Sequence, residues 1–224
     1  MRNSKVKLLL LLGLFASLNL YTTAVNAQYY GDEPTFFGGF VLGTNFAQVD
    51  GDNFAGYRKI GLNGGAMVHT RLADEFTLSM ELLYAEKGSI AGKGQLPKRS
   101  ATNPSVLINE YDIRMRTAEV SLGVNYFFKD KKSIVHIGLA PNYMVDATSS
   151  VNGVETIDLY PFKKFGLDGY IGASYRIYKR FYLNTKFQIS ALNIRKIHDP
   201  SVERPQQTSR LLTLRLLYLM KDYE

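Results

Sequence analysis

The sequence predicts an all-β fold: an eight-stranded antiparallel up-and-down transmembrane β-barrel that follows a cleaved N-terminal signal peptide. Three observations support this. Apolar and polar residues alternate with a period of two along much of the chain, the connections between the alternating runs are in turn short and long, and the first segment has the composition of a secretory leader.

The leader begins with Arg2, Lys5 and Lys7 and continues as an apolar run over residues 8–20. This run is too short for a membrane-spanning helix, and Val25-Asn26-Ala27 follows as a small-residue cleavage site. We therefore predict cleavage between Ala27 and Gln28, with residues 1–27 as signal peptide and residues 28–224 as the barrel domain. Losing three basic residues lowers the formal charge from +7 to +4. Export disfavours a nucleic-acid partner.

Eight segments satisfy the period of two. They are roughly residues 36–48, 59–72, 76–88, 110–127, 133–146, 163–177, 181–193 and 208–220. The short turns at about 72–75, 129–132 and 178–180 alternate with long polar connections at about 49–58, 89–109, 147–162 and 194–207. This alternation is typical of a bacterial barrel with tight periplasmic turns and longer outside loops, whereas a soluble sandwich has no reason to place its short turns at one end.

The two faces of each strand differ in polarity. In the segment 181–193, Phe181, Leu183 and Phe187 share one face, while Asn184 and Lys186 share the other. In a membrane barrel the polar face points inward. A soluble lipocalin-like barrel that binds an apolar ligand is the alternative, and it requires the apolar residues inside.

The segment 110–127 departs from simple alternation. Its apolar residues are odd-numbered at Tyr111, Ile113 and Met115 but even-numbered from Val120 onward. Either a β-bulge near residues 117–119 changes the parity, or residues 111–116 extend beyond the bilayer, where polarity need not alternate.

The inward faces carry charges of both signs. Eight strands leave a lumen just wide enough for side chains, so we expect these charges to pair and fill it, with a narrow ion path as the alternative. The predicted lumen charge network comprises Lys59, Arg71, Glu81, Lys87, Glu119, Asp168, Arg176, Lys186 and Arg215.

No pattern in the sequence predicts a catalytic, cofactor or metal site. The run Asp50 to Asn53 lacks the spacing and distal Glu of an EF-hand and reads as a solvated turn. His198, Asp199 and Ser201 contain the groups of a hydrolytic triad, but neighbours in one loop seldom converge on one centre. The sequence contains no cysteine, so it suggests neither a zinc site nor an anchor through a lipid-bearing cysteine. The basic loop 92–100 could attract anionic lipopolysaccharide or an outside partner, but we favour the interpretation of a soluble, mobile loop.

Three ordered motifs carry a family resemblance. They are G-x-x-x-G-x-N at residues 39–45, K-x-G-x-x-x-G at 59–65, and E-L-x-Y-x-x-K-G-S at 81–89. Together they make the chain resemble the PorT-like outer-membrane β-barrel family of Bacteroidetes. The resemblance implies a non-enzymatic outer-membrane barrel, surrounded by outer-membrane lipids, with a structural, surface-interaction or secretion-associated role. We also expect a monomer, with a secretion-system or surface protein as a candidate partner, although a shared fold does not transfer a task.

Overall fold

The computed structural model describes residues 36–100, 105, 107–130, 132–155, 161–196 and 206–220, without the side chains of Lys93 and Lys196. Eight long strands carry the fold. They are β1 (Phe36–Asp50), β2 (Lys59–Arg71), β3 (Phe76–Ile90), β6 (Tyr111–Phe127), β7 (Ser133–Val151), β9 (Phe165–Tyr178), β10 (Phe181–Ser190) and β12 (Gln206–Leu219). In the loops lie the 3₁₀ turn η1 (Lys93–Gln95) and the two-residue strands β4 (Lys98–Arg99), β5 (Leu107–Ile108), β8 (Val154–Glu155) and β11 (Arg195–Lys196).

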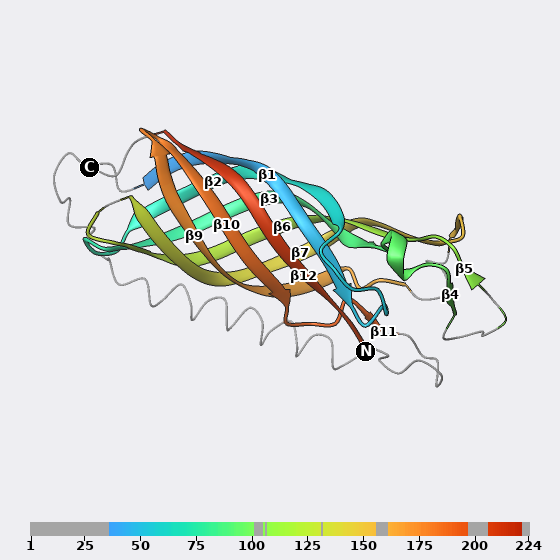
Figure 1. The fold of residues 1–224 in the computed structure, drawn as a ribbon. Coiled ribbons are helices and arrows are strands. Elements are labelled where there is room, and N and C mark those ends of the chain that lie inside the picture. Colours follow the sequence, from blue (N-terminus) through green and yellow to red (C-terminus); the bar gives the residue numbers. More distant parts are fainter. Residues whose placement is uncertain are drawn as a thin grey trace, which may run out of the picture. The chain divides into compact units, whose positions relative to one another are not determined.

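The long strands follow one another around a closed antiparallel barrel (Figure 1). Each pairs with its neighbour in sequence, and β1 closes the circle by pairing with β12 from Gly39↔Leu219 to Asp50↔Thr208. The predicted eight-stranded up-and-down barrel is therefore confirmed. Among the described residues, no helix is long and apolar enough to cross a membrane.

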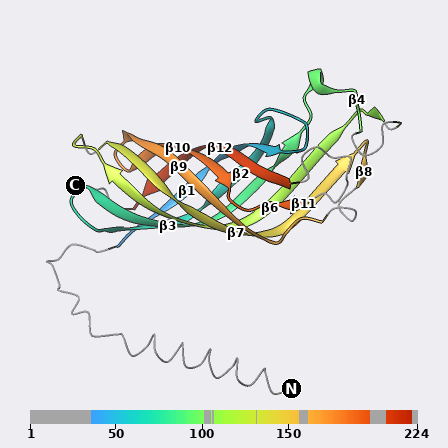
Figure 2. The same ribbon diagram turned by 90° about the horizontal axis from the view of Figure 1, so that it is seen from below.

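The two ends of the barrel differ, as the alternating connections predict. Residues 72–75, the stretch that contains 128–130 and 132, and residues 179–180 make the tight turns at one end, while η1, β4, β5, β8 and β11 lie at the other (Figures 1 and 2). The main difference from prediction lies in β7, which continues to Val151, because its upper part forms an extended hairpin with β6. In contrast, β10 ends at Ser190, three residues earlier than predicted.

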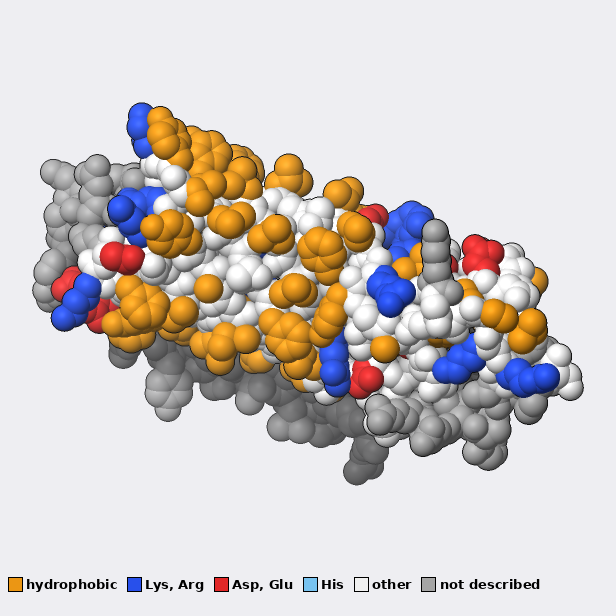
Figure 3. Space-filling view, in the orientation of Figure 1, with side chains coloured by type: hydrophobic (Ala, Val, Ile, Leu, Met, Phe, Trp, Pro, Cys, Tyr) orange, Lys and Arg blue, Asp and Glu red, His pale blue; other side chains and the backbone are white. Residues whose placement is uncertain are grey.

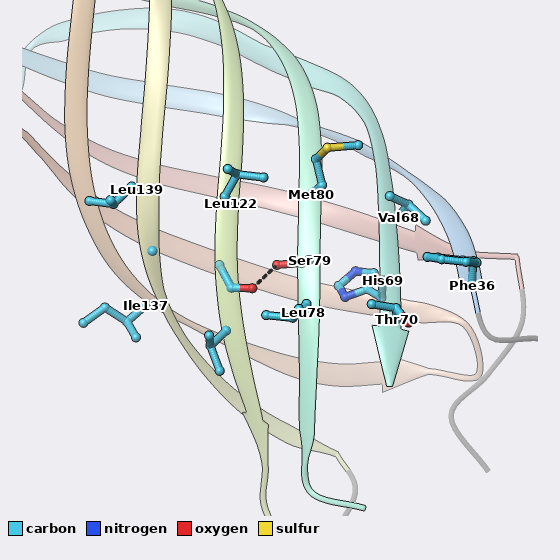
Figure 4. Close-up of a pocket in the computed structure, with 13 residues that line it drawn as sticks. Phe36, Val68, His69, Thr70, Leu78, Ser79, Met80, Leu122, Ile137 and Leu139 are labelled. Carbon is cyan, nitrogen blue, oxygen red and sulfur yellow. Dashed lines mark hydrogen bonds between the residues drawn. The ribbon is translucent and has the colours of Figure 1, made fainter. Parts of the chain in front are cut away.

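Apolar side chains cover the outside of the barrel (Figure 3). Leu42 is 70% exposed and Ile137 63% exposed, although both lie within long strands. Val68, Met80, Leu122 and Leu139 face outward side by side on four neighbouring strands in one register row (Figure 4). Along β1 the apolar positions run from Phe36 to Phe46, about 25 Å after allowance for strand tilt. This is the height of a membrane-facing band, so the lipocalin-like alternative is wrong.

Aromatic rings border this band at both edges. At the periplasmic edge, Phe76 contacts Tyr126 with centroids 5.2 Å apart, and Phe181 contacts Tyr218 at 5.1 Å. At the outer edge, Tyr143 meets Phe165 edge-on at 5.1 Å. Such belts place amphipathic rings at the headgroups. Phe127 also lies beside a short turn, but its side chain points into the lumen and is 6% exposed.

The parity of β6 does not change. Its odd-numbered residues from Tyr111 to Phe127 all face inward. The register irregularity falls beside Arg116 and Thr117, but the extra residue, Val145, belongs to β7. The inward face is apolar at Ile113 and Met115 because these residues lie in the extracellular extension, where the barrel interior has an apolar core. The prediction of a bulge within the 110–127 strand is thus wrong. The alternative, in which residues 111–116 extend beyond the bilayer, agrees with the structure.

Strands β2 and β3 overlap at their extracellular ends. Their backbone pairing stops at Asn63↔Ala85, although both strands continue. A Cβ on Gly61 would lie 2.6 Å from the carbonyl oxygen of Glu86, so glycine permits β3 to cross close to β2. Side chains replace the missing ladder: the Glu86 carboxylate accepts from the Leu62 amide at 3.1 Å, and the Asn45 amide donates to the Glu86 carbonyl at 2.8 Å.

Candidate functional site

The barrel lumen contains two linked groups of buried charges. In the first, the Glu81 carboxylate on β3 receives three hydrogen bonds from across the barrel. Arg215 on β12 donates through Nη1 at 2.9 Å and Nη2 at 3.2 Å, and Lys186 on β10 donates at 2.7 Å. A guanidinium that grips both oxygens of one carboxylate forms a strong and directional pair. Asn184 holds the remaining edge of Arg215 by accepting from Nε at 2.8 Å.

The second group centres on Lys87 of β3. Its ammonium lies 2.6 Å from Asp168 on β9 and 3.0 Å from Glu119 on β6. The Gln188 amide donates to both carboxylates, at 2.8 Å and 2.9 Å. Ser121 connects the two groups, because it donates to Glu119 at 3.0 Å and accepts from Lys186 at 3.5 Å.

Charge balance is the main electrostatic feature of this middle layer. Three cations, Lys87, Lys186 and Arg215, face three carboxylates, Glu81, Glu119 and Asp168, and all six residues are buried. An unpaired charge at such depth would be costly, whereas pairs with further hydrogen bonds are tolerated. The layer is therefore neutral as a whole, and each described charge in it has its counter-charge within contact.

Tyr170 on β9 fills the space beside these charges. The Lys186 ammonium lies 4.1 Å from the centre of its ring. The ring reaches over two neighbouring strands, where a Cβ on Gly123 would lie 2.2 Å from the Tyr170 hydroxyl and one on Gly138 2.6 Å from it. Gly123 and Gly138 pair with each other, and Gly138 pairs with Tyr170. The paired glycines thus leave space for the Tyr170 ring, and the ring fills the part of the lumen beside the charged groups.

An apolar layer lies at the periplasmic end of the lumen. Phe37, Phe127, Ile134, Tyr182 and Leu219 belong to one buried cluster, and Tyr182 is fully buried. These side chains occupy positions on the inward face, where the period of two predicts polar residues. Sequence reasoning missed this layer, although the aromatic residues Phe37 and Tyr182 on otherwise polar faces were a usable signal.

A second apolar layer caps the extracellular end. Val49, Phe54, Tyr111, Ile113 and Met115 form its buried centre, with partly buried neighbours such as Leu96, Met144 and Phe162 packed against it. Phe54 comes from the β1–β2 loop and meets Tyr111 with ring centroids 4.5 Å apart. The loop between β1 and β2 therefore inserts into the barrel mouth.

Asp52 accompanies Phe54 into this mouth. Its Oδ1 accepts from the Phe54 amide at 2.8 Å, and the residue is 8% exposed. Burial raises the pKa of the Asp52 carboxyl from 3.8 to about 6, against the opposing effects of Ser89 and Arg195. Arg195 is itself buried, donates to Gln207 at 2.6 Å and stacks on Phe162 at 4.4 Å. Asp52 is thus buried in the cap and does not lie in a solvated turn.

The structure distributes the predicted charge network over three places. Glu81, Lys87, Glu119, Asp168, Lys186 and Arg215 meet in the middle layer. Lys59 is buried nearer the extracellular end of the barrel, where it pairs with Asp112 of β6 across the overlap of β2 and β3. Arg71 and Arg176 occupy inward positions but lie near the periplasmic rim, where Arg71 is exposed and Arg176 half-buried. These two do not belong to the buried network, because their strands end there.

Other predicted features fall outside the described residues. These are the signal peptide with its Ala27 and Gln28 junction, and the loop residues His198, Asp199 and Ser201. Within the described part of the chain, no three His, Cys, Asp or Glu side chains come together in a way that could hold a metal ion. What the lumen residues can do chemically is to neutralise one another and exclude water.

Comparisons with known proteins give one matching family and several similar structures. The family model described as "Outer membrane protein beta-barrel domain" matches residues 11–194. Neisserial surface protein A is similar in structure, with a TM-score of 0.49, 11% identity, and coverage of 83% of this chain and 97% of that chain. Ail of Yersinia pestis is similar at 0.44 and 10%, with 83% and 100% covered. OprG of Pseudomonas aeruginosa is similar at 0.39 and 11%, with 83% and 94% covered.

No functionally curated protein matches the chain in sequence. The family model nevertheless spans well over half of it, from residue 11 to residue 194. A barrel that spans the outer membrane requires an apolar outer face, aromatic belts and a closed circle of strands, and this barrel has all three. This chain belongs to the outer membrane protein beta-barrel domain family and is a protein of the bacterial outer membrane.

Proposed function

We propose that this outer-membrane barrel conducts no ions, catalyses no reaction and serves as a rigid support for an extracellular interaction surface. The observation that carries the proposal is the filling of its lumen in three layers. An apolar layer closes each end, and a neutral layer of paired charges lies between them. A hydrated ion would have to break buried ion pairs and also cross two apolar layers.

Contacts between the extracellular loops favour a surface role. Lys98 of the β3–β6 loop donates to the Asn53 carbonyl of the β1–β2 loop at 3.0 Å, and its ammonium lies 5.4 Å from the centre of the Phe54 ring. Gln95 donates to the Ala55 carbonyl at 3.0 Å. These contacts join two loops into one continuous surface, which a protein partner can recognise more readily than separate mobile loops.

The more specific assignment is to the PorT-like type, with cleavage of the leader before Gln28 and a structural, surface-interaction or secretion-associated task. The three ordered motifs support it, and two of them lie at positions that the barrel uses. Asn45 is the last residue of the first motif and contacts Glu86 at the β2–β3 overlap. Lys87 lies near the end of the third motif and pairs with Glu119 in the charged layer. Co-purification of a secretion-system or surface protein with the intact barrel, lost on deletion of residues 92–106, would support this assignment. Unchanged partner binding after the deletion would show that this loop is not the binding site.

An ion-flux assay tests the closed lumen. The purified barrel is placed in liposomes that contain a potassium-sensitive dye, and flux is compared with that of liposomes that carry an open porin. We expect flux at the level of empty liposomes. The triple variant Tyr182→Ala, Ile113→Ala and Met115→Ala thins both apolar layers and should raise the flux. Wild-type flux near that of the open porin would refute the proposal.

A rim enzyme that acts on lipid is the competing class of function. It would require His198, and a lipid-modifying activity abolished by His198→Ala in otherwise folded protein would establish it. No feature of the layered lumen favours such an enzyme.

A further inference from the structure

One groove on the lipid-facing surface lies directly below a cluster of cations. It measures 550 Å³ and crosses β3, β6, β7 and β9 in the outer-leaflet half of the band. Its lining includes Leu82, Ala118, Pro141, Tyr143, Phe165 and Gly166. Small residues such as Ala118 and Gly166 make it hollow, and the rings of Tyr143 and Phe165 border it at the level of the outer aromatic belt.

Basic residues lie immediately above this groove. Arg116 is the next outward-facing residue of β6 after Ala118, and the exposed Arg114 follows it. On the other side of β7, the exposed Lys163 and Lys164 lead into β9 just before Phe165. Backbone bonds hold this segment in place, because the Lys164 carbonyl accepts from the Met144 amide at 2.7 Å and the Lys163 amide donates to the Ile194 carbonyl at 2.8 Å.

The described rim carries more positive than negative charge. Four cations face three carboxylates, Glu86, Asp112 and Asp146, of which Asp112 already pairs with Lys59. Arg116 lies 3.0 Å from Asp146 and 4.0 Å from Glu86, but the side chains of Arg116 and Asp146 are 43% and 49% exposed. Solvent weakens such pairs, so an anion can compete for the remaining guanidinium N–H groups.

The spacing of the cations favours a ligand with two phosphates. The arginines lie on β6 and the lysines at the start of β9, with β7 between them, so the two groups are about 10 Å apart. A phospholipid with a single glycerophosphate, such as phosphatidylglycerol, presents one phosphate, whereas the acylated disaccharide at the base of lipopolysaccharide can carry a phosphate at each end.

We propose that this groove and its basic rim bind lipid A, with an acyl chain in the groove and the two phosphates on the arginine and lysine groups. Apolar contact supplies area, and the charges supply orientation. The site lies entirely on the outer face, so it is independent of whether the lumen conducts.

The test measures lipid retained by the purified, folded barrel. Wild-type protein in mild detergent is incubated with diphosphorylated lipid A, dephosphorylated lipid A or phosphatidylglycerol, and bound lipid is counted by native mass spectrometry. We expect diphosphorylated lipid A to bind at least tenfold more strongly than the other two. Equal binding of phosphatidylglycerol, or of the dephosphorylated lipid, would overturn the proposal.

Variants test the two parts of the site separately. The triple change Arg116→Gln, Lys163→Gln, Lys164→Gln should lower lipid A binding about tenfold, and Ala118→Phe should lower it by filling the groove. Matched controls are Lys179→Gln with Arg180→Gln at a periplasmic turn, and Ala173→Phe on the lipid-facing side of β9; both should bind like wild type. Heat-modifiable migration confirms folding of each variant. Wild-type affinity in the folded triple variant would refute the site, even if Ala118→Phe failed to fold.

Discussion

Glu81 supports two buried cations, and its neutralisation should strongly destabilise the barrel. Its side chain is 6% exposed, and those of Lys186 and Arg215 are 2% and 0% exposed. Glu81→Gln keeps the shape but leaves two cations facing one neutral amide. Breaking one buried pair costs about 3–5 kcal/mol. Asn184 and the Tyr170 ring still contact the stranded cations, so we expect a loss near the lower end, about 3 kcal/mol.

Equilibrium unfolding in guanidinium, with the barrel in phospholipid vesicles, measures this loss. Circular dichroism is the suitable signal because the chain contains no tryptophan. Asp146→Asn removes an exposed ion pair and should change the free energy of unfolding by less than about 1 kcal/mol. Adding Lys186→Met to Glu81→Gln should restore part of the stability, because the layer is then neutral again, with Lys87 and Arg215 balancing Glu119 and Asp168. A Glu81→Gln loss no larger than that of Asp146→Asn would refute the paired-charge account.

Three further outcomes follow from other parts of the barrel. Gly138→Ala should cost about 1–3 kcal/mol in the same unfolding assay, because its Cβ would lie 2.1 Å from the Leu122 carbonyl oxygen and 2.6 Å from the Tyr170 hydroxyl, whereas Gly169→Ala, with nothing within 4 Å, should cost under 1 kcal/mol; equal losses would contradict the packing. Leu122→Arg on the lipid face should cost about 2–4 kcal/mol, and wild-type stability would contradict the orientation of the strands. Because burial raises the pKa of Asp52 to about 6, the inserted loop binds a proton more tightly than the released loop; insertion is thus strongest below pH 3.8 and weakens as the pH rises through 6. Hydrogen exchange of the loop amides should therefore be slower at pH 4 than at pH 7.5, after correction for intrinsic rates, and Asp52→Asn should abolish this difference.

The strands were predictable because the bilayer imposes a period of two that the residues show directly. Leu183, Phe187 and Lys186 face opposite media, and no long-range information is needed to place them. The short turns were predictable for a similar reason, since at each of them a few residues interrupt the alternation and a new alternating run follows at once. The extent of β7 was not, because the strand above the membrane no longer separates lipid from lumen.

The lumen was predictable by parity but not by depth. Parity places Arg71 and Arg176 inside, yet both lie near the rim, and only the register of neighbouring strands shows this. Likewise Lys59 pairs with Asp112, from the outward parity of β6, because β2 and β3 overlap there. The apolar layers were missed because polar-in alternation describes the average of a barrel wall, whereas both ends of this lumen are filled with apolar side chains.

Single-channel recording of the wild-type barrel in a planar bilayer tests the closed lumen most directly. Incorporation is verified in the same membranes by the heat-modifiable band, so that silence cannot come from an empty bilayer. The account predicts no stable open level across the range of applied voltage, because the paired charges and two apolar layers leave no hydrated path. A reproducible open conductance with a fixed step size would contradict it.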